Sequence, residues 1–314
     1  MTGRKPALPR PQTPAPGPPT TGQNAGISDT GAHAGSSGFV DAVILEVKRQ
    51  RGVDFSCHDR QRVRDEIVAR AARLCPAGRE GYLDLLRADR TERDRLVDAL
   101  LVQVSSFFRN PIVFELIAQD VLPATLERKR RGRSREIRVW SAGCASGEEA
   151  YSVAILIRQA FSEACERWAS LVFATDVSES ALSSARRGIY DVDRLSEVKL
   201  GVLDACFTPA ADGYMVRPFI RDTVMFSNDD LTSPDRAVPP ESIYGAFDIV
   251  MCRNLLIYLD RACQDRVLDK LCRSLSPGGY LILGEAEGLA GAGRRGMTTV
   301  NGRNKIYQKR GRPT

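Results

Sequence analysis

The stretch Val139–Tyr151 reads VWSAGCASGEEAY, and its two halves predict different kinds of structure. The apolar run over Ile137–Ala142 predicts a buried strand, and the spacing of apolar side chains from Glu148 to Phe161 predicts a helix. Between them, the small residues of the turn Gly143–Gly147 let a ligand approach the backbone, and the helix start offers free N–H groups. An ordinary strand-to-helix turn, with acids favoured in the first helical turn, is an equally good interpretation.

The alternation of strands and helices continues towards the C-terminus. Buried strands that alternate with helices are typical of a parallel, doubly wound sheet, so we expect an α/β fold of the Rossmann-like class. The further strands are expected at Leu171–Thr175, Phe247–Cys252 and Tyr280–Gly284, the helices at Glu179–Arg187 and Arg261–Leu275, and a terminal hairpin at Thr298–Val300 and Lys305–Tyr307.

The N-terminal part of the chain has a different composition. Residues 1–38 are rich in Pro, Gly, Ser and Thr and contain no aromatic residue before Phe39, so we expect a disordered tail. Apolar residues at helical spacing predict a helical domain over 39–125. The basic segment 126–135 is expected to link it to a second domain at 136–310. That segment has no interleaved aromatic residue, so a nucleic-acid role is not favoured.

One predicted helix of the N-terminal domain carries several arginines. They form either a solvated helix surface or a docking face for an acidic helix, and a net charge of +6 fits an acidic partner. These arginines are Arg60, Arg62, Arg64, Arg70 and Arg73.

The composition excludes several classes of site. The only histidines are His33 and His58, so a histidine-ligated metal or a histidine base is not expected. The eight cysteines form no CxxC pair, which favours reduced thiols. No apolar run approaches the roughly 20 residues that cross a bilayer, and the N-terminus lacks a secretory signal. We therefore expect a cytoplasmic protein without membrane insertion.

Polar residues follow the predicted strands where the sheet would end. Ligands of such sheets bind beyond the carboxyl ends of the strands. Asp176 ends one strand, where a carboxylate accepts hydrogen bonds from ribose hydroxyls, although a turn or cap aspartate is common there. Arg253, Asn254 and Tyr258 follow another strand, and Tyr258 is also compatible with a core position. These residues favour a cleft for a nucleoside-containing cofactor.

Five segments resemble the CheR-type chemotaxis receptor methyltransferases in order and spacing. That family transfers a methyl group from S-adenosyl-L-methionine to receptor glutamates, which gives glutamate methyl esters and S-adenosyl-L-homocysteine. The segments are SSFFR at Ser105–Arg109, VWSAGCASGEEAYS at Val139–Ser152, FATDVSESALSSARRGIY at Phe173–Tyr190, FDIVMCRNLLIYLD at Phe247–Asp260 and PGGYLILGEAEGL at Pro277–Leu289.

The resemblance implies a protein-glutamate O-methyltransferase whose partner is the acidic, helical cytoplasmic domain of a chemoreceptor. It places Arg109 and Tyr258 beside the acceptor carboxylate, with Asp176 on the ribose. It also implies a small β-subdomain at about 192–224, which in some members binds a receptor's C-terminal peptide. The implied cofactor-binding residues, including the turn glycine, are Gln103, Ser105, Arg109, Gly143, Glu148, Asp176, Asp230, Leu231, Arg253 and Asn254.

The sequence departs from the family pattern at three of its positions. Gln103 and Asp230 stand where Asn is common, and Glu285 stands where His is usual. Two other functions stay open: a related methyltransferase with a nucleic-acid or small-molecule acceptor, and a receptor-docking adaptor without enzymatic activity. The (D/N)PP(Y/F) motif of amino-directed DNA methyltransferases is absent, and a dehydrogenase is disfavoured because the loop lacks GxGxxG.

Overall fold

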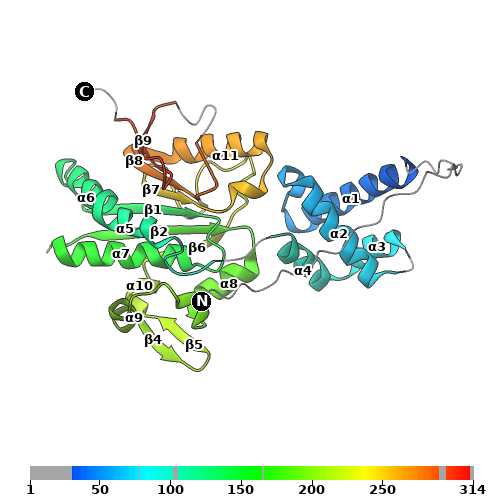
Figure 1. Cartoon of the computed structure of the whole chain (residues 1–314), viewed down its shortest axis with the longest axis horizontal. Coiled ribbons are helices and arrows are strands. Elements are labelled where there is room, and N and C mark those ends of the chain that lie inside the picture. The colour runs from blue at the N-terminus through cyan, green and yellow to red at the C-terminus, as the bar shows by residue number, and fades with distance from the viewer. Residues whose placement is uncertain (1–29, 77, 102–104, 165, 290–294, 312–314) are drawn as a thin grey trace, which may run out of the picture.

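The computed structural model describes residues 30–76, 78–101, 105–164, 166–289 and 295–311, which form a helical body and an α/β body (Figure 1). Most of the expected tail, residues 1–29, lies outside the described residues. Helix α1 spans Thr30–Arg51, so the first helix begins before Phe39, where the apolar pattern starts.

The helical body packs its helices around a small apolar core. The buried residues include Val43, Val63, Ile67, Leu96 and Leu100, which lie at the predicted helical spacing. Its elements are α1, the short helix η1 (Phe55–Cys57), α2 (Arg60–Leu74), α3 (Arg79–Ala88) and α4 (Arg90–Leu100).

A buried ion pair connects the last three of these helices. The Arg70 Nε and Nη2 atoms donate to the two carboxylate oxygens of Glu92 at 2.6 and 3.0 Å. The Tyr82 hydroxyl donates to Glu92 Oε1 at 2.9 Å. Burial raises the pKa of Tyr82, which keeps it a donor. Arg70 is therefore not part of a surface, and Arg60 pairs with Asp41, so the arginines of α2 do not form one uniform docking face.

The α/β body is built on a seven-stranded sheet in the order β6-β2-β1-β7-β8-β10-β9. Strands β6, β2, β1, β7 and β8 are parallel, and β10 runs antiparallel between β8 and β9. This topology confirms the expected doubly wound fold. The strands are β1 (Glu136–Ala142), β2 (Ala169–Asp176), β6 (Val224–Asn228), β7 (Phe247–Cys252), β8 (Leu275–Leu283), β9 (Met297–Asn301) and β10 (Ile306–Lys309).

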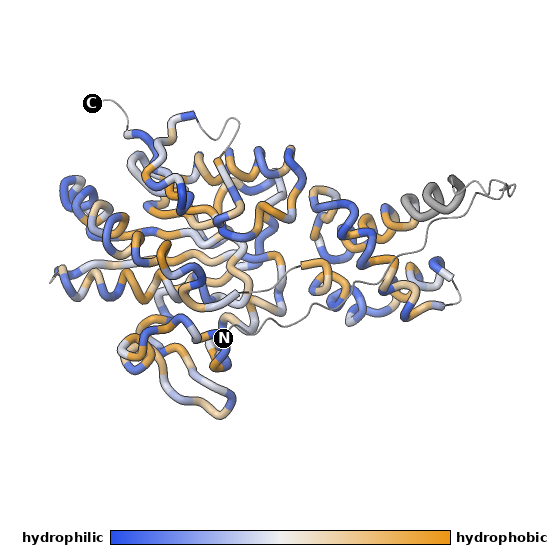
Figure 2. The backbone as a smooth tube through the Cα atoms, in the orientation of Figure 1, coloured by the Kyte–Doolittle hydropathy of each residue, from blue (hydrophilic) through white to orange (hydrophobic). Residues whose placement is uncertain are grey.

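Successive residues of the central strands enter different cores on the two faces of the sheet. Val139 belongs to the cluster under α6 and α7, whereas its neighbour Trp140 belongs to the cluster under α11. Hydrophobic residues accordingly gather along the central strands (Figure 2). The helices of this body that border the sheet are α6 (Leu122–Arg131), α7 (Glu148–Ala164), α8 (Glu179–Arg187) and α11 (Arg261–Ser274).

The division between the two bodies differs from the expected boundary at residue 125. Phe107 and Phe114 are buried in the same cluster as the sheet residue Val139, together with the helices α5 (Pro111–Leu116), η2 (Ile117–Val121) and α6. Among the described residues, the last buried residue of the helical body's core is Leu100, and Leu101 and Val177 pack against it. The helices after Phe107 therefore belong to the α/β body, because their apolar sides face the sheet.

The expected linker at 126–135 is also part of this body. Helix α6 continues to Arg131, and Lys129 Nζ lies 2.9 Å from the buried carboxylate of Asp248 on β7. Arg128 pairs with the same carboxylate. A buried carboxylate needs such partners. Two residues of the predicted linker, Arg128 and Lys129, thus fasten α6 to the sheet.

A small antiparallel sheet lies beside the main one, in the order β3-β5-β4. Its strands are β3 (Ile189–Tyr190), β4 (Phe207–Ala210) and β5 (Gly213–Val216), with α9 (Leu200–Cys206) before β4 and α10 (Pro218–Arg221) after β5. It occupies the place of the expected β-subdomain (Figure 1). Among the described residues, no helix has the length and apolar character to cross a membrane.

The buried pair in the helical body gives a first prediction. Glu92→Ala leaves the Arg70 guanidinium and the Tyr82 hydroxyl without their acceptor, and breaking a buried ion pair costs about 3–5 kcal/mol. We expect that loss in the unfolding free energy of the helical body, measured by urea titration. The exposed Glu80, changed to Ala, serves as control and should cost about 0.5 kcal/mol or less. Equal effects of both variants would contradict this account.

Candidate active site

The carboxyl ends of β2, β1 and β7 lie side by side and open into two adjoining cavities. The larger, with a volume of ≈ 100 Å³, lies between the helical body and the sheet, and the smaller, with a volume of ≈ 40 Å³, lies towards α5. Gly143, Ala145 and Asn254 line both of them, so the two cavities adjoin at these residues, and together they are called the cleft.

The turn after β1 bends back over the end of β2. Gly143 has φ 76°, and a Cβ atom there would lie 2.2 Å from Leu255 Cδ1. The Gly143 and Cys144 N–H groups both donate to the Thr175 carbonyl, at 2.8 and 3.0 Å. Ala145 also has a left-handed φ, of 47°. Only a residue without a side chain fits at Gly143, which leaves bare backbone in the cleft wall.

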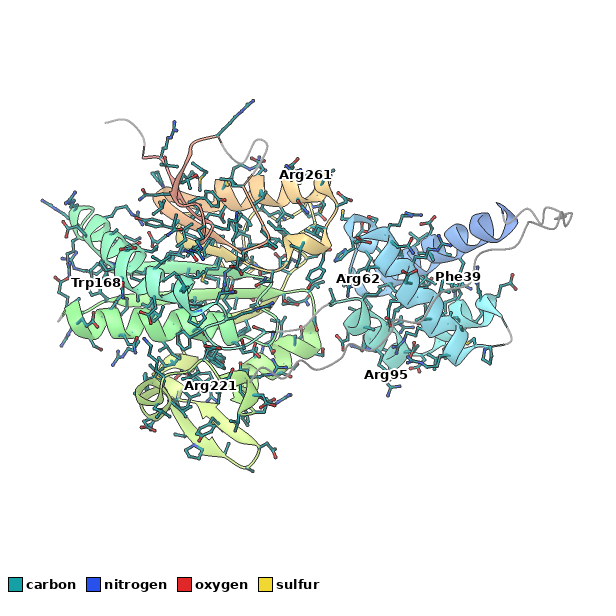
Figure 3. The ribbon with its side chains drawn as sticks, in the orientation of Figure 1. Phe39, Arg62, Arg95, Trp168, Arg221 and Arg261 are labelled. Atoms are coloured by element: carbon teal, nitrogen blue, oxygen red, sulfur yellow. The ribbon has the colours of Figure 1, made fainter. Side chains whose placement is uncertain are left out.

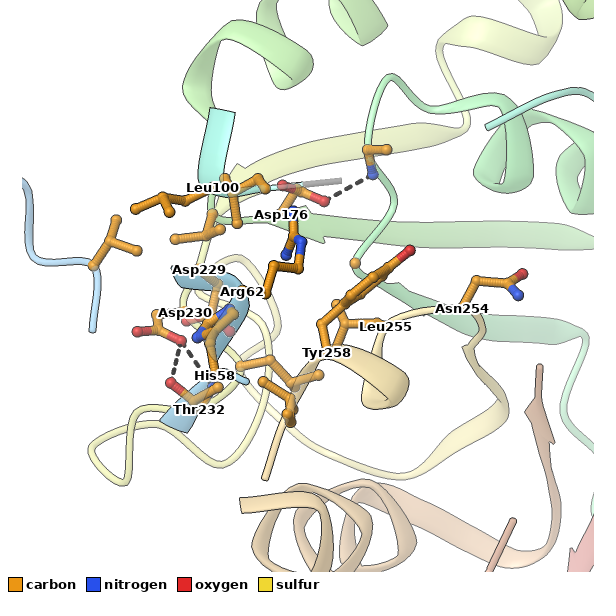
Figure 4. A pocket seen from close by; sticks show the side chains of 17 residues that line it. His58, Arg62, Leu100, Asp176, Asp229, Asp230, Thr232, Asn254, Leu255 and Tyr258 are labelled. Carbon is orange, nitrogen blue, oxygen red and sulfur yellow. Dashed lines mark hydrogen bonds between the residues drawn. The ribbon is translucent and has the colours of Figure 1, made fainter. Parts of the chain in front are cut away.

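Asp176 holds this turn and also lines the larger cavity (Figure 4). Its Oδ2 accepts from the Ala145 N–H at 2.8 Å, and its Oδ1 accepts from the Ser178 N–H at 2.9 Å. The cap of α8 is Ser178, not Asp176. Burial raises the pKa of Asp176, although backbone donors oppose this rise. Asp176 thus stabilises the turn and also lines the cleft, where a ribose could reach it.

The two acids that begin α7 have different surroundings. Glu148 is fully buried, lines neither cavity and binds Ser146 Oγ and the Arg194 guanidinium. Glu149 lines the smaller cavity, where it accepts from Ser141 Oγ at 3.0 Å. Burial raises the pKa of Glu149, and the nearby Arg253 lowers it. Neighbouring residues of a helix point about 100° apart. In this structure Glu149, and not the predicted Glu148, therefore lines the cleft.

Arg253, at the end of β7, connects three segments of the smaller cavity. Its Nη2 donates to the Arg109 carbonyl at 3.0 Å and to Asn110 Oδ1 at 2.9 Å, and its Nη1 lies 3.3 Å from Glu149 Oε2. Arg253 itself is buried. The predicted residues Ser105 and Arg109 line the same cavity. Ser105, Arg109 and Arg253 thus line one cavity in the structure.

The opposite end of the cleft is formed by the segment after β6. Asp230 and Leu231 line the larger cavity, as the sequence predicts. The Asp230 Oδ1 atom accepts from the Thr232 N–H at 2.8 Å and from Thr232 Oγ1 at 2.6 Å, which fixes the turn (Figure 4). Gln103, the remaining predicted contact, lies outside the described residues.

The helical body supplies a wall that the sequence did not indicate. His58 and Arg62 line the larger cavity, and the Arg62 guanidinium lies 5.2 Å from the centre of the Tyr258 ring. Arg62 is on the side of the helical body that faces the sheet (Figure 3). Burial lowers the pKa of His58. Sequence periodicity assigns such residues to a helix surface, and only tertiary packing shows what that surface faces.

Two backbone hydrogen bonds fasten the bodies beside this wall. The Asp59 N–H donates to the Tyr258 carbonyl at 2.9 Å, and the Asp260 N–H donates to the Cys57 carbonyl at 2.8 Å. Tyr258 is therefore held from both bodies. In the described part of the chain, no group of three or more His, Cys, Asp or Glu residues is arranged to hold a metal ion.

The family model described as "CheR methyltransferase, SAM binding domain" matches residues 103–305. The chain belongs to this family. The chemotaxis protein methyltransferase of Salmonella typhimurium is 32% identical over 247 residues, which cover 77% of this chain and 80% of that protein. The Vibrio cholerae chemotaxis protein methyltransferase 1 is 36% identical over 219 residues, which cover 66% of this chain and 74% of that protein.

An uncharacterized 104.1 kDa protein of Rhodobacter capsulatus is also similar, with 36% identity over 228 residues. The match covers 72% of this chain but 23% of that protein, so the chain spans about a quarter of that relative. This CheR-family methyltransferase uses S-adenosylmethionine as its cofactor.

The cleft of this methyltransferase fits that cofactor. Gly143 lines both cavities with backbone atoms alone, and the Leu255 side chain occupies the space where a Cβ atom of Gly143 would lie. Asp176 and Asp230 are acceptors at one end, where hydroxyl and amino groups need them, and Glu149 is an acceptor at the other end, suited to an ammonium group.

The contrast between the two acids of α7 gives a second prediction. Glu149→Gln removes the charge that lines the smaller cavity. We expect the Kd of S-adenosylhomocysteine to rise at least about tenfold, because the loss of one hydrogen bond to a charged group has an effect of that size. Glu148→Gln weakens the pair with Arg194 instead, so it should lower thermal stability while the Kd changes less than about threefold. Calorimetry of both variants checks this. A larger loss of affinity in Glu148→Gln would return that role to Glu148.

Proposed function

We propose that this methyltransferase transfers the methyl group of S-adenosyl-L-methionine to glutamate carboxylates in the cytoplasmic domain of chemoreceptors. The products would be glutamate methyl esters and S-adenosyl-L-homocysteine. The observation that carries the proposal is the extent of the similarity: the relative from Salmonella typhimurium, whose name is chemotaxis protein methyltransferase, matches 77% of this chain. That match is longer than the cofactor-binding domain, which begins at residue 103.

The chemistry of a carboxylate acceptor suits the residues of the cleft. S-Adenosylmethionine supplies an electrophilic methyl group on a positively charged sulfur. A glutamate with a pKa of about 4.3 is already a nucleophile at neutral pH, so it needs no general base. His58 is the only histidine of the cleft wall among the described residues, and burial lowers its pKa. The chain's task is therefore to orient the two reactants and to exclude water.

The proposal assigns roles to residues of both cavities. Tyr258 would donate a hydrogen bond from its hydroxyl to one acceptor oxygen and leave the other oxygen free to attack. Arg109 would orient the acceptor by its charge. Asp176 and Glu149 would hold the nucleoside and amino-acid parts of the cofactor, with Arg253 fixed between Glu149 and Arg109.

The remaining cofactor contacts of the proposal line the same two cavities. Ser105, Gly143 and Asn254 line the smaller cavity, and Asp230 and Leu231 line the larger one. The proposal also includes the small sheet β3-β5-β4 as the place for a receptor's C-terminal peptide, because strands at the edge of a sheet pair readily with an extended chain.

Methyl transfer to candidate receptor fragments tests this function directly. Tritiated S-adenosylmethionine should label cytoplasmic receptor fragments but not nucleic acid, and mass mapping should place the added methyl on glutamate. Label that appears only on nucleic acid or small molecules would overturn the acceptor. If the protein fails to bind S-adenosylhomocysteine in calorimetry, that result would instead support the adaptor function. The acidic and cationic side chains that line the cleft argue against that function.

The proposed role of Tyr258 gives a third prediction. Tyr258→Phe removes one hydrogen bond to a charged acceptor, so kcat should fall by about 10-fold to 100-fold. The Kd of S-adenosylhomocysteine should change less than about threefold, because the ring and its contact with Arg62 are kept. Tyr244→Phe, at a tyrosine that is 70% exposed and outside the cleft, is the matched control. Equal losses of turnover and affinity would argue against an acceptor role for Tyr258.

A further inference from the structure

Glu287 follows β8 and carries a buried carboxylate, although it lines neither cavity of the cleft. Its exposed fraction is 6%. Its partners are backbone N–H groups, and two of its four hydrogen bonds come from residues of the cleft wall. Oε2 accepts from Gly284 at 2.6 Å and from Asn254 at 3.1 Å, and Oε1 accepts from Leu255 at 2.8 Å and from Leu256 at 2.7 Å.

These hydrogen bonds hold a segment whose backbone is unusual. Asn254 has φ 59°, a left-handed conformation that asparagine adopts more readily than other residues with a side chain. Three successive N–H groups, from Asn254 to Leu256, point to one carboxylate. No strand or α-helix would satisfy them in this way. The carboxylate therefore holds the loop by accepting hydrogen bonds from three successive N–H groups that regular secondary structure would otherwise pair.

The loop held by Glu287 contains the residues that shape the cleft. The Leu255 side chain fills the space where a Cβ of Gly143 would lie, 2.2 Å from Cδ1. The Tyr258 N–H donates to the Leu255 carbonyl at 3.1 Å, so the position of Tyr258 follows that of Leu255. Asn254 lines both cavities. A shift of this loop would move the cofactor end and the acceptor end of the cleft together.

The space around the carboxylate admits little adjustment. A Cβ atom on Gly284 would lie 2.6 Å from Glu287 Oε2 and 2.7 Å from the Asn254 nitrogen. A carboxylate is also the side-chain group that fits four donors, because its two oxygens only accept hydrogen bonds. A glutamine of the same shape would turn its NH₂ group towards two of the N–H donors. Two buried donors would then lose their acceptor.

We propose that Glu287 is a positioning residue for methyl transfer, which orders the Asn254–Leu256 loop and thereby sets Tyr258 against the cofactor cleft. It acts through backbone hydrogen bonds and not by contact with either substrate. This inference rests on the proposed function for its kinetic consequence, whereas the ordering of the loop is independent of which acceptor is methylated.

The ordering is tested by hydrogen exchange in the full-length protein. We expect the peptides that cover Asn254–Leu256 to exchange at least about tenfold faster in Glu287→Gln, while the helices of the helical body keep their protection. Glu287→Asp, a shorter acceptor-only side chain, should lie between wild type and Glu287→Gln. The exposed Glu241, changed to Gln, removes the same charge without these contacts and should match wild type. Unchanged protection of the loop in Glu287→Gln would overturn the proposal.

The kinetic consequence is measured on receptor fragments with the same variants. We expect Glu287→Gln to lower kcat by about 30-fold or more, with KM for the receptor fragment changed less than about threefold and with partial recovery in Glu287→Asp. A kcat within twofold of wild type in folded Glu287→Gln, or an Asp variant no better than the Gln variant, would contradict the positioning role.

Two controls distinguish a global loss of folding from this role: the variant Glu287→Asp, and the hydrogen exchange of the helices in the helical body. If Glu287→Gln does not fold, the comparison of Glu287→Asp with wild type decides by the same two measurements. If wild type binds S-adenosylhomocysteine but methylates no receptor fragment, the proposed function fails, and the exchange of the loop still decides whether Glu287 orders it.

Discussion

The site depends most on the contacts that the buried guanidinium of Arg253 makes. This guanidinium joins the end of β7 to Glu149 in the first turn of α7 and to the backbone carbonyl of Arg109. A buried cation is stable only with an opposite charge and acceptors around it, so these segments cannot move independently. The strand ends of a parallel sheet bring them near one another, and Arg253 then fixes their distances.

The cleft also depends on a seam between two bodies with separate cores. Backbone hydrogen bonds from Asp59 to Tyr258 and from Asp260 to Cys57 hold the bodies together beside the cleft. Arg62 of the helical body faces the ring of Tyr258. Residues of both bodies therefore contact Tyr258, the residue proposed to hold the acceptor. The helical body is thus part of the site, in addition to any contact with a receptor.

Much of the fold was predictable, because buried strands and amphipathic helices leave strong local patterns. Helix Glu179–Arg187 and strand Phe247–Cys252 have the predicted bounds, and the predicted turn at Gly143 lies in the cleft. The boundary at residue 125 was not predictable in this way. The helices after Phe107 have the same periodicity as those of the helical body, and only their packing partner, the sheet, distinguishes them.

The sequence by itself determined the fold class, the family and the polar residues at the strand ends, since these follow from periodicity and from motifs of neighbouring residues. Tertiary structure alone decided which of two adjacent acids, Glu148 or Glu149, faces the cleft, because the answer depends on the Arg194 that binds the other one. It also decided that Glu287 supports the Asn254 loop. Such contacts join residues far apart in the chain, and no local pattern records them.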